Sequence, residues 1–408
     1  MTLALPDRAA QADRPVRVML CDDSPTVRSA FARILESDPA VQVVARVGDG
    51  QQALDTLHTL PRETRPQVML LDLEMPVMDG MTALPLLLKA QPSLAVIVAS
   101  ALTQRGAEVT MAAMRAGAAD YVPKPRAAEG GMSDPGFRAE LLAKVKGWAR
   151  MRAPPTQIPG AVSPPAPPRP GLRAPSPLAG GVPVGMTAGG PAGLAAAAPQ
   201  RALAGAGKKP RLLAIGSSTG GPQALAGFVR RLTTPLPVPI VIVQHMPAGF
   251  TAMLADHLSR LGGPQAAEAK EGEALLPGRI YVAPGDRHLL VEAAAAGLQA
   301  RLTMDPPENF CRPAVDPMLR SAAKACEGRV LAVILTGMGQ DGMLGCKAVA
   351  AAGGMVLAQD EASSVVWGMP GAVAKAGLAQ ALLPPEQLAD KVLAQFGTAG
   401  LSSAGGVA

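Results

Sequence analysis

The chain has 408 residues, 48% of them apolar but only 2% aromatic, which is too long for one ordinary core and predicts two domains with aliphatic interiors. The net charge of +6 comes from residues 151–209, which hold six of the 38 basic residues and none of the 32 acidic ones, so a basic face for nucleic acid is not expected. Four unpaired cysteines favour the cytoplasm, and the lack of a signal-peptide core or a bilayer-length apolar run argues against direct membrane insertion.

The first third of the chain alternates strand-length apolar runs with amphipathic helical stretches. This alternation is typical of a doubly wound parallel sheet. Five strands are predicted over VRVMLC, QVVARV, QVMLLD, LAVIVAS and ADYVP. The first helix is marked by Ser24 as its cap and by Pro25 at its first position. Residues 16–135 are therefore predicted to form a five-stranded parallel α/β domain.

Residues 150–207 change in composition to proline, alanine and glycine. Such a segment cannot bury enough side-chain surface to offset its ordering entropy, so it is predicted to be a flexible linker. The strand and helix alternation returns over residues 208–395, with strands predicted over RLLAIGSS, PIVIVQH, RIYVAP, RVLAVILTG and GGMVLAQD. This pattern predicts a second α/β domain with a mainly parallel sheet.

Polar side chains stand at the predicted strand ends of the first domain. Asp22 and Asp23 end the first strand and Asp72 ends the third. Because the carboxyl ends of parallel strands meet at one sheet edge, these carboxylates should converge and require a cation, for which Mg²⁺ is suited. Ser100 and Lys124 end the fourth and fifth strands, where they could neutralise a phosphoryl group carried on a carboxylate.

These residues lie in segments that resemble the receiver domain of two-component response regulators. The similarity covers residues 16–126 through CDDS, DLEMPVMDG, VASAL and YVPKP. It implies a flavodoxin-like fold and phosphorylation of Asp72 by a histidine kinase. The residues that it places at Mg²⁺ are Asp22, Asp23, Asp72 and, through its main chain, Glu74. Those that it places at the phosphoryl group or at the aromatic switch are Ser100, Lys124 and Tyr121.

A GxSxG sequence, Gly216–Gly220, joins a predicted strand to a predicted helix in the second domain. Such a turn raises a serine hydroxyl, here that of Ser218, above the sheet and aims main-chain amides at a developing oxyanion. A serine nucleophile needs a base, and His245 ends the next strand on the same sheet edge. His257, inside a helix, and His288, in a turn, are weaker candidates.

The base needs an orienting carboxylate, and three aspartates lie near strand ends: Asp286, Asp341 and Asp360. Spacing alone leaves the choice among them open. A GxGxxG sequence at Gly337, Gly339 and Gly342 also leaves open a nucleotide-binding output domain and oxidoreductase activity. Two further alternatives are a response regulator with a catalytically inactive output domain and a DNA-binding regulator. The last is least favoured, since no helix-turn-helix or basic face follows the linker.

Residues 211–392 are similar to the catalytic domain of the chemotaxis protein-glutamate methylesterase (CheB) family. The similarity runs through IGSSTGGPQAL, VIVQHMPAGFT, GRIYVAPGDRHL, RPAVDPMLRSAA, LTGMGQDGMLG and VWGMPGAVAKAG. It implies Ser218 as nucleophile, His245 as base and Asp341 as its orienter. The residues implied to flank the oxyanion are Thr219 and Met338. The commoner IGAST is IGSST here, a change at Ser217 that is expected to preserve activity.

The resemblance implies hydrolysis of glutamate γ-methyl esters on the cytoplasmic helices of methylated chemoreceptors, without a cofactor in this domain. The reaction would pass through an acyl-enzyme on Ser218. Some members of the family also deamidate glutamine, and the sequence leaves this activity open. Because a switchable domain is tethered to a hydrolase, the unphosphorylated first domain is expected to cover the Ser218 cleft. Phosphorylation of Asp72 is then expected to uncover it.

Overall fold

A computed structural model describes residues 15–101, 103–124, 131–152 and 209–397 of the chain. All of these residues belong to one compact unit. The predicted linker lies outside the described residues from residue 153 onward, and its first three residues end a helix. Within the described part of the chain, no helix is long and apolar enough to cross a membrane.

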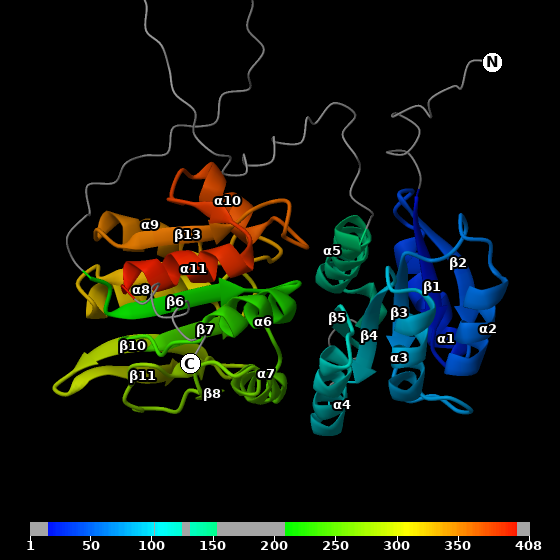
Figure 1. The fold of residues 1–408 in the computed structure, drawn as a ribbon, viewed down its shortest axis with the longest axis horizontal. Coiled ribbons are helices and arrows are strands. Elements are labelled where there is room, and N and C mark those ends of the chain that lie inside the picture. The colour runs from blue at the N-terminus through cyan, green and yellow to red at the C-terminus, as the bar shows by residue number, and fades with distance from the viewer. Residues whose placement is uncertain (1–14, 102, 125–130, 153–208, 398–408) are drawn as a thin grey trace, which may run out of the picture. The chain divides into compact units, whose positions relative to one another are not determined.

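The N-terminal domain is built on a five-stranded sheet with the order β2-β1-β3-β4-β5, in which every neighbouring pair is parallel. Its strands are β1 (Val16–Cys21), β2 (Val41–Val47), β3 (Val68–Asp72), β4 (Ala95–Ala101) and β5 (Asp120–Lys124). Its α-helices are α1 (Pro25–Leu35), α2 (Gly50–Thr59), α3 (Gly80–Ala90), α4 (Gln104–Arg115) and α5 (Pro135–Arg152) (Figure 1). The five predicted strands and the doubly wound fold are confirmed.

Alternate residues of the central strands serve the two faces of this sheet. On β3, Leu71 packs in the cluster that contains the buried residues of α2, α3 and α4. Leu70 packs in the cluster of α1 and α5. Both faces are therefore apolar, which explains why the strands read as continuous apolar runs. Helix α5 begins at residue 135, where the predicted domain ended, and buries Leu141 and Val145 with the strands, so it is part of this fold.

The C-terminal domain contains a seven-stranded sheet with the order β14-β13-β12-β6-β7-β9-β8 and parallel pairing throughout. The strands are β6 (Leu212–Ser217), β7 (Ile240–Gln244), β8 (Ala266–Glu268), β9 (Ile280–Val282), β12 (Val330–Ile334), β13 (Met355–Gln359) and β14 (Leu382–Leu383). The predicted strands correspond to β6, β7, β9, β12 and β13. Only the short edge strands β8 and β14 were not predicted for this sheet.

A two-stranded antiparallel hairpin, β10 (His288–Ala294) and β11 (Gly297–Thr303), was also not predicted. Its turn lies within an alanine-rich stretch, and alanine has little preference for strands. The turn uses Gly297 at a φ of 132° in place of an Asn-Gly or Asp-Gly pair, so the usual hairpin signal is missing.

Helices cover both faces of the seven-stranded sheet. They are α6 (Gly221–Arg231), α7 (Phe250–Ser259), α8 (Val315–Ala325), α9 (Met343–Ala351), α10 (Met369–Lys375) and α11 (Pro385–Gln395) (Figure 1). On β6, Leu213 and Ile215 pack with the buried residues of α6, α7 and α11. Leu212 and Ala214 pack with those of α8, α9 and α10. The carboxyl ends of β6, β7 and β12 consequently lie side by side at one edge of a fully covered sheet.

Candidate functional site

Three carboxylates converge at the carboxyl edge of the N-terminal sheet, as the sequence predicts. One oxygen each of Asp22, Asp23 and Asp72 lies within 4.8 Å of the others. Asp22 and Asp72 are buried, whereas Asp23 is exposed. Buried carboxylates repel one another without a cation, and an exposed third oxygen ligand leaves room for water molecules, which Mg²⁺ retains. These residues therefore fit a divalent cation such as Mg²⁺.

Lys124, at the end of β5, reaches the same carboxylates. Its Nζ lies 2.7 Å from Asp72 Oδ2 and 2.8 Å from Asp22 Oδ2. Burial alone would lower the pKa of Lys124, but the two carboxylates raise it, so the side chain remains charged. Burial raises the pKa of Asp72, and the ammonium group opposes that rise. The predicted phosphoacceptor thus already has a cation at hydrogen-bond distance.

The other residues predicted around this edge have individual positions. Ser100 is the residue before the last of β4 and donates a hydrogen bond from Oγ to the Gly106 carbonyl oxygen at 3.1 Å. The exposed side chain of Glu74 lies 3.8 Å from Arg105, so it points to solvent while its main chain follows β3. Tyr121 is buried on β5 and is described below.

The serine turn of the C-terminal domain follows β6 directly. Ser218 lies between the end of the strand and α6, and Gly220 adopts a φ of 74°, which glycine permits without strain. The turn is fixed from beneath by a buried pair: Ser217 Oγ donates to Gln244 Oε1 at 2.7 Å. The Gln244 amide in turn donates to the Ser218 carbonyl oxygen at 2.9 Å. Ser217 is therefore a hydrogen-bonding residue that supports the serine turn.

His245 follows β7, and its ring contacts Asp341, which follows β12. The distance from His245 Nε2 to Asp341 Oδ2 is 2.8 Å. Burial alone would lower the pKa of His245, but its hydrogen bonds with Asp341 and Cys311 raise that pKa to about 10. Burial would raise the pKa of Asp341, yet its hydrogen bond with His245 lowers it. An ionised carboxylate only accepts hydrogen bonds, so in the neutral form of His245 the proton is on Nε2 and Nδ1 is the proton acceptor.

The Asp341 carboxylate also receives main-chain hydrogen bonds from helix α8. The N–H groups of Val315 and Asp316 donate to it at 2.6 and 3.0 Å, and Gly342 donates at 2.9 Å. The first N–H groups of a helix lack partners within the helix, and the helix dipole favours negative charge there. The carboxylate is consequently both immobilised and kept ionised.

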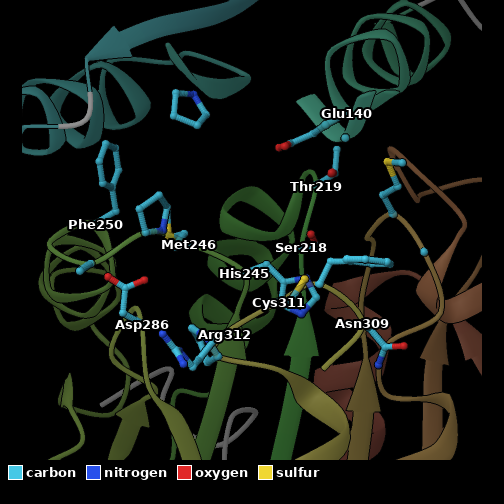
Figure 2. A pocket seen from close by; sticks show the side chains of 18 of the residues that line it. Glu140, Ser218, Thr219, His245, Met246, Phe250, Asp286, Asn309, Cys311 and Arg312 are labelled. Atoms are coloured by element: carbon cyan, nitrogen blue, oxygen red, sulfur yellow. The ribbon is translucent and has the colours of Figure 1, made fainter. Parts of the chain in front are cut away.

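Four of the five residues implied by the resemblance for this domain line one cavity of about 720 Å³ (Figure 2). Ser218, Thr219, His245 and Met338 all contribute to its wall. Figure 2 shows His245 and Cys311 next to one another below Ser218. Chemically, this arrangement provides a hydroxyl nucleophile, an imidazole base and a buried carboxylate at one pocket.

The competing residues have other partners. His288 is buried and accepts from the Ala314 N–H group at Nδ1, so it supports the segment before α8. His257 is buried in α7, where burial first and then nearby arginines lower its pKa. Asp360 Oδ1 accepts from the Ser363 N–H group in a local turn. Asp286 lines the pocket but is not the carboxylate bound to His245.

Two pocket residues were not identified from the sequence. Cys311 Sγ lies 3.4 Å from His245 Nδ1. Asn309 Nδ2 donates to Asp341 Oδ1 at 3.0 Å. Both lie in the segment between β11 and α8, which has no strand or helix of its own in the structure. Histidines and carboxylates are common catalytic residue types, whereas a single asparagine or cysteine in a loop belongs to no motif with a characteristic spacing.

Together, the two folds and the residues of the pocket define a response regulator whose output domain is a hydrolase. The protein-family model described as "Response regulator receiver domain" matches residues 18–132, and the family model described as "CheB methylesterase" matches residues 213–392. The chain belongs to the CheB methylesterase family, and the alternatives of a nucleotide-binding or DNA-binding output domain are not favoured.

Similar proteins span almost the whole chain. A protein-glutamate methylesterase/protein-glutamine glutaminase of Azospirillum brasilense is 50% identical over 94% of this chain and 93% of its own length. A protein of the same name from Paramagnetospirillum magneticum is 49% identical, covering 95% of this chain and 98% of its own. The crystal structure of the Thermotoga maritima CheB methylesterase catalytic domain is 41% identical, covering 46% of this chain and 99% of that one, with a TM-score of 0.45.

Replacement of Ser217 tests the support beneath the serine turn. In Ser217→Ala, the buried Gln244 Oε1 loses the donor 2.7 Å away, and an unsatisfied buried acceptor costs about 1–3 kcal/mol of unfolding free energy. Thermal and urea unfolding should show this loss, whereas Ser29→Ala, which removes an exposed helix-surface hydroxyl, should change stability little. Equal stability of the two variants would contradict the supporting role of Ser217.

Proposed function

We propose that this chain is a phosphorylation-controlled protein-glutamate methylesterase that hydrolyses glutamate γ-methyl esters on the cytoplasmic helices of chemoreceptors. The observation that carries the proposal is the His245–Asp341 hydrogen bond at 2.8 Å beside Ser218, in a pocket of a chain that is 50% identical to a named methylesterase. We further propose a receiver domain through α5, a flexible linker up to about residue 207, and a catalytic domain over residues 208–395. Four free cysteines fit action in a reducing cytoplasm.

In the proposed reaction, Ser218 Oγ attacks the ester carbonyl carbon while His245 Nδ1 takes the hydroxyl proton. For this step, Nδ1 exchanges its contact with the Cys311 thiol for the serine hydroxyl. The imidazolium then gives the proton to the departing methanol oxygen, which leaves an acyl-enzyme. A water molecule, deprotonated by the same nitrogen, hydrolyses the acyl-enzyme and restores the serine. Asp341 stabilises the imidazolium throughout.

The oxyanion that forms during each attack needs hydrogen-bond donors. We assign this role to the main-chain N–H groups of Thr219 and Met338, which line the pocket beside Ser218. The same attack on a primary amide would release ammonia, so glutamine deamidation is a second candidate activity of this site. The names of the A. brasilense and P. magneticum relatives include both activities.

Replacement of the proposed nucleophile separates the two domains' chemistry. Ser218→Ala should lower methanol release from methylated receptor membranes by about 10⁴- to 10⁶-fold, because the attacking oxygen is lost. Phosphorylation of Asp72 by a small-molecule phosphodonor should continue, since Asp72 belongs to the sheet of the N-terminal domain. Methanol release near the wild-type rate would eliminate Ser218 as the nucleophile.

Replacement of the orienting carboxylate tests the choice among the three aspartates. Asp341→Asn should lower turnover by about 10³- to 10⁴-fold, because a neutral amide neither stabilises the imidazolium nor enforces the Nε2–H tautomer. Asp286→Asn and Asp360→Asn are the matched controls and should retain turnover within a few-fold. The assignment fails if either control loses more activity than Asp341→Asn.

The first domain is proposed to accept a phosphoryl group on Asp72 from a histidine kinase. Asp23, Asp72 and the Glu74 main chain would hold Mg²⁺, with Asp22 in support, and the ion would supply positive charge for phosphoryl transfer. Lys124 is the cation of this chain that would contact the phosphoryl oxygens, together with Ser100 after its hydrogen bond to the Gly106 carbonyl oxygen opens.

Control by covering of the pocket is supported by contacts between the two domains. The Tyr121 ring stacks on Phe250 of α7, with centroids 5.3 Å apart. Asp120 Oδ2 accepts from the Gly220 N–H group, two residues after Ser218, at 3.2 Å. Glu140 of α5 lines the pocket itself. Strand β5 thus carries Tyr121 to the catalytic domain and ends at the lysine that binds Asp72.

Weakening these contacts should release the catalytic domain without phosphorylation. Gln223 donates to the Ala118 carbonyl oxygen at 2.8 Å, and Arg150 donates to the Ser364 carbonyl oxygen at 2.5 Å. The double variant Gln223→Ala/Arg150→Ala should raise basal methanol release roughly tenfold, because two lost hydrogen bonds together shift a closed–open equilibrium by about 1.5 kcal/mol. Deletion of residues 1–207 should have the same or a larger effect.

The matched control is Asp72→Asn in the full chain, which should keep activity low whatever phosphodonor is added. If both the deletion and the double variant were no faster than the unphosphorylated full-length protein, control by covering would be refuted. The first domain would then have to activate by delivering the enzyme to its receptor.

A further inference from the structure

A second buried carboxylate lies beside Asp341 at the start of α8. Asp316 is 1% exposed, and its Oδ1 accepts from the Gly345 N–H group at 2.6 Å. The side-chain amide of Asn309 lies between the two acids. Its Nδ2 donates to Asp341 Oδ1 at 3.0 Å and to Asp316 Oδ2 at 3.0 Å. Ionised carboxylates only accept hydrogen bonds, so the amide nitrogen must face them.

The proposed mechanism needs Asp341 to remain ionised, and Asp316 opposes this. Two buried carboxylates repel each other, and one of them tends to retain its proton. Burial and the charge of Asp341 raise the pKa of Asp316 to about 6. The hydrogen bond from Asn309 lowers this pKa and so opposes the rise. The amide is therefore a neutral double donor at the point where the repulsion is greatest.

The backbone at this position also restricts the residue type. Asn309 has a φ of 53°, in the left-handed region that asparagine and glycine adopt more readily than other residues. Glycine would satisfy the backbone but would provide no donor. Aspartate would fit the backbone and the space, but would add a third negative charge. Among these residues, asparagine alone meets the backbone and the electrostatic demand together.

We propose that Asn309 is a positioning residue of the hydrolytic reaction, whose side-chain amide separates Asp341 from Asp316 and holds the Asp341 carboxylate aimed at His245. The inference rests on the proposed function. Asn309 acts through Asp341 and not on the substrate, so its loss should lower kcat and leave KM nearly unchanged.

The titratable and charged groups near this amide come from its own loop, from α8 and α9, and from the ends of β7 and β12. They are Glu308, Cys311, Asp316, Arg320, Cys346, His245 and Asp341. Arg320 is paired with Glu308, with its Nη2 2.6 Å from the carboxylate oxygen Oε2. A charge introduced at position 309 would therefore act mainly on Asp316, Asp341 and His245.

Two substitutions in the full-length, phosphorylated protein with Mg²⁺ test the proposal. Asn309→Gly keeps the left-handed backbone and removes the amide, so kcat should fall roughly 10- to 100-fold with KM within about twofold. Asn309→Asp keeps the size and adds a negative charge, which raises the pKa of Asp316, Asp341 and His245. Activity needs ionised Asp341 and neutral His245, both of which are lost as pH falls through these values. The acid limb of the kcat profile should consequently move to higher pH.

A matched control separates the amide from the effect of a new glycine. Glu327 also has a left-handed backbone, at a φ of 52°, and lies beyond the C-terminal end of α8, outside the pocket lining. Glu327→Gly should retain the kcat and the pH profile of the wild-type protein. Circular dichroism and thermal unfolding show whether each variant is folded before its activity is compared.

The titration of His245, followed by NMR, gives a second measurement that does not need methanol release. Its midpoint should rise in Asn309→Asp and stay unchanged in Glu327→Gly. The proposal is overturned if Asn309→Gly keeps kcat within about threefold, or if Asn309→Asp leaves both the acid limb and the His245 midpoint unchanged. Absence of methanol release by the wild-type protein would instead refute the proposed function, and the His245 titration would still decide the role of Asn309.

Discussion

The structure of the catalytic pocket depends on one buried carboxylate, that of Asp341. The same two oxygen atoms accept from His245, from the first N–H groups of α8 and from the Asn309 amide. A carboxylate free in an apolar interior would take up a proton, whereas one that receives several donors at a helix start stays ionised. The fold therefore keeps Asp341 ionised, and this charged carboxylate orients the His245 imidazole.

The need to keep Asp341 ionised explains how the neighbouring elements are arranged. Helix α8 must begin at the pocket with no side chain of its own as a cap, because Asp341 satisfies its first N–H groups. Glycine at position 342 lets the chain turn from the carboxylate into α9 at a φ of 90°. The loop before α8 must pass close enough to bring Asn309 to the acid and Cys311 to the base.

Strand β5 of the first domain carries residues that contact both Asp72 and the catalytic domain. In the first domain, Asp72 and Lys124 form an ion pair, and Tyr121 lies three residues before the lysine on the same strand. Because adjacent residues on a strand point to opposite faces, β5 can hold Lys124 at the Asp72 carboxylate and Tyr121 against Phe250. A single strand thus joins the Asp72 ion pair to the ring that stacks on Phe250.

The sequence by itself determined both α/β folds, the predicted central strands and the residues at their carboxyl ends, because apolar runs, cap residues and glycine turns act over a few residues. The hairpin β10–β11 and the edge strands were decided only by tertiary structure, and strand-end spacing alone did not show that Asp341, and not Asp286 or Asp360, contacts His245. The hydrogen bonds of Ser217 and Asn309 were decided there as well, since a hydrogen bond between residues 27 or 32 positions apart leaves no local pattern. Sheet order and helix packing set such distances, and neither is a property of any short segment.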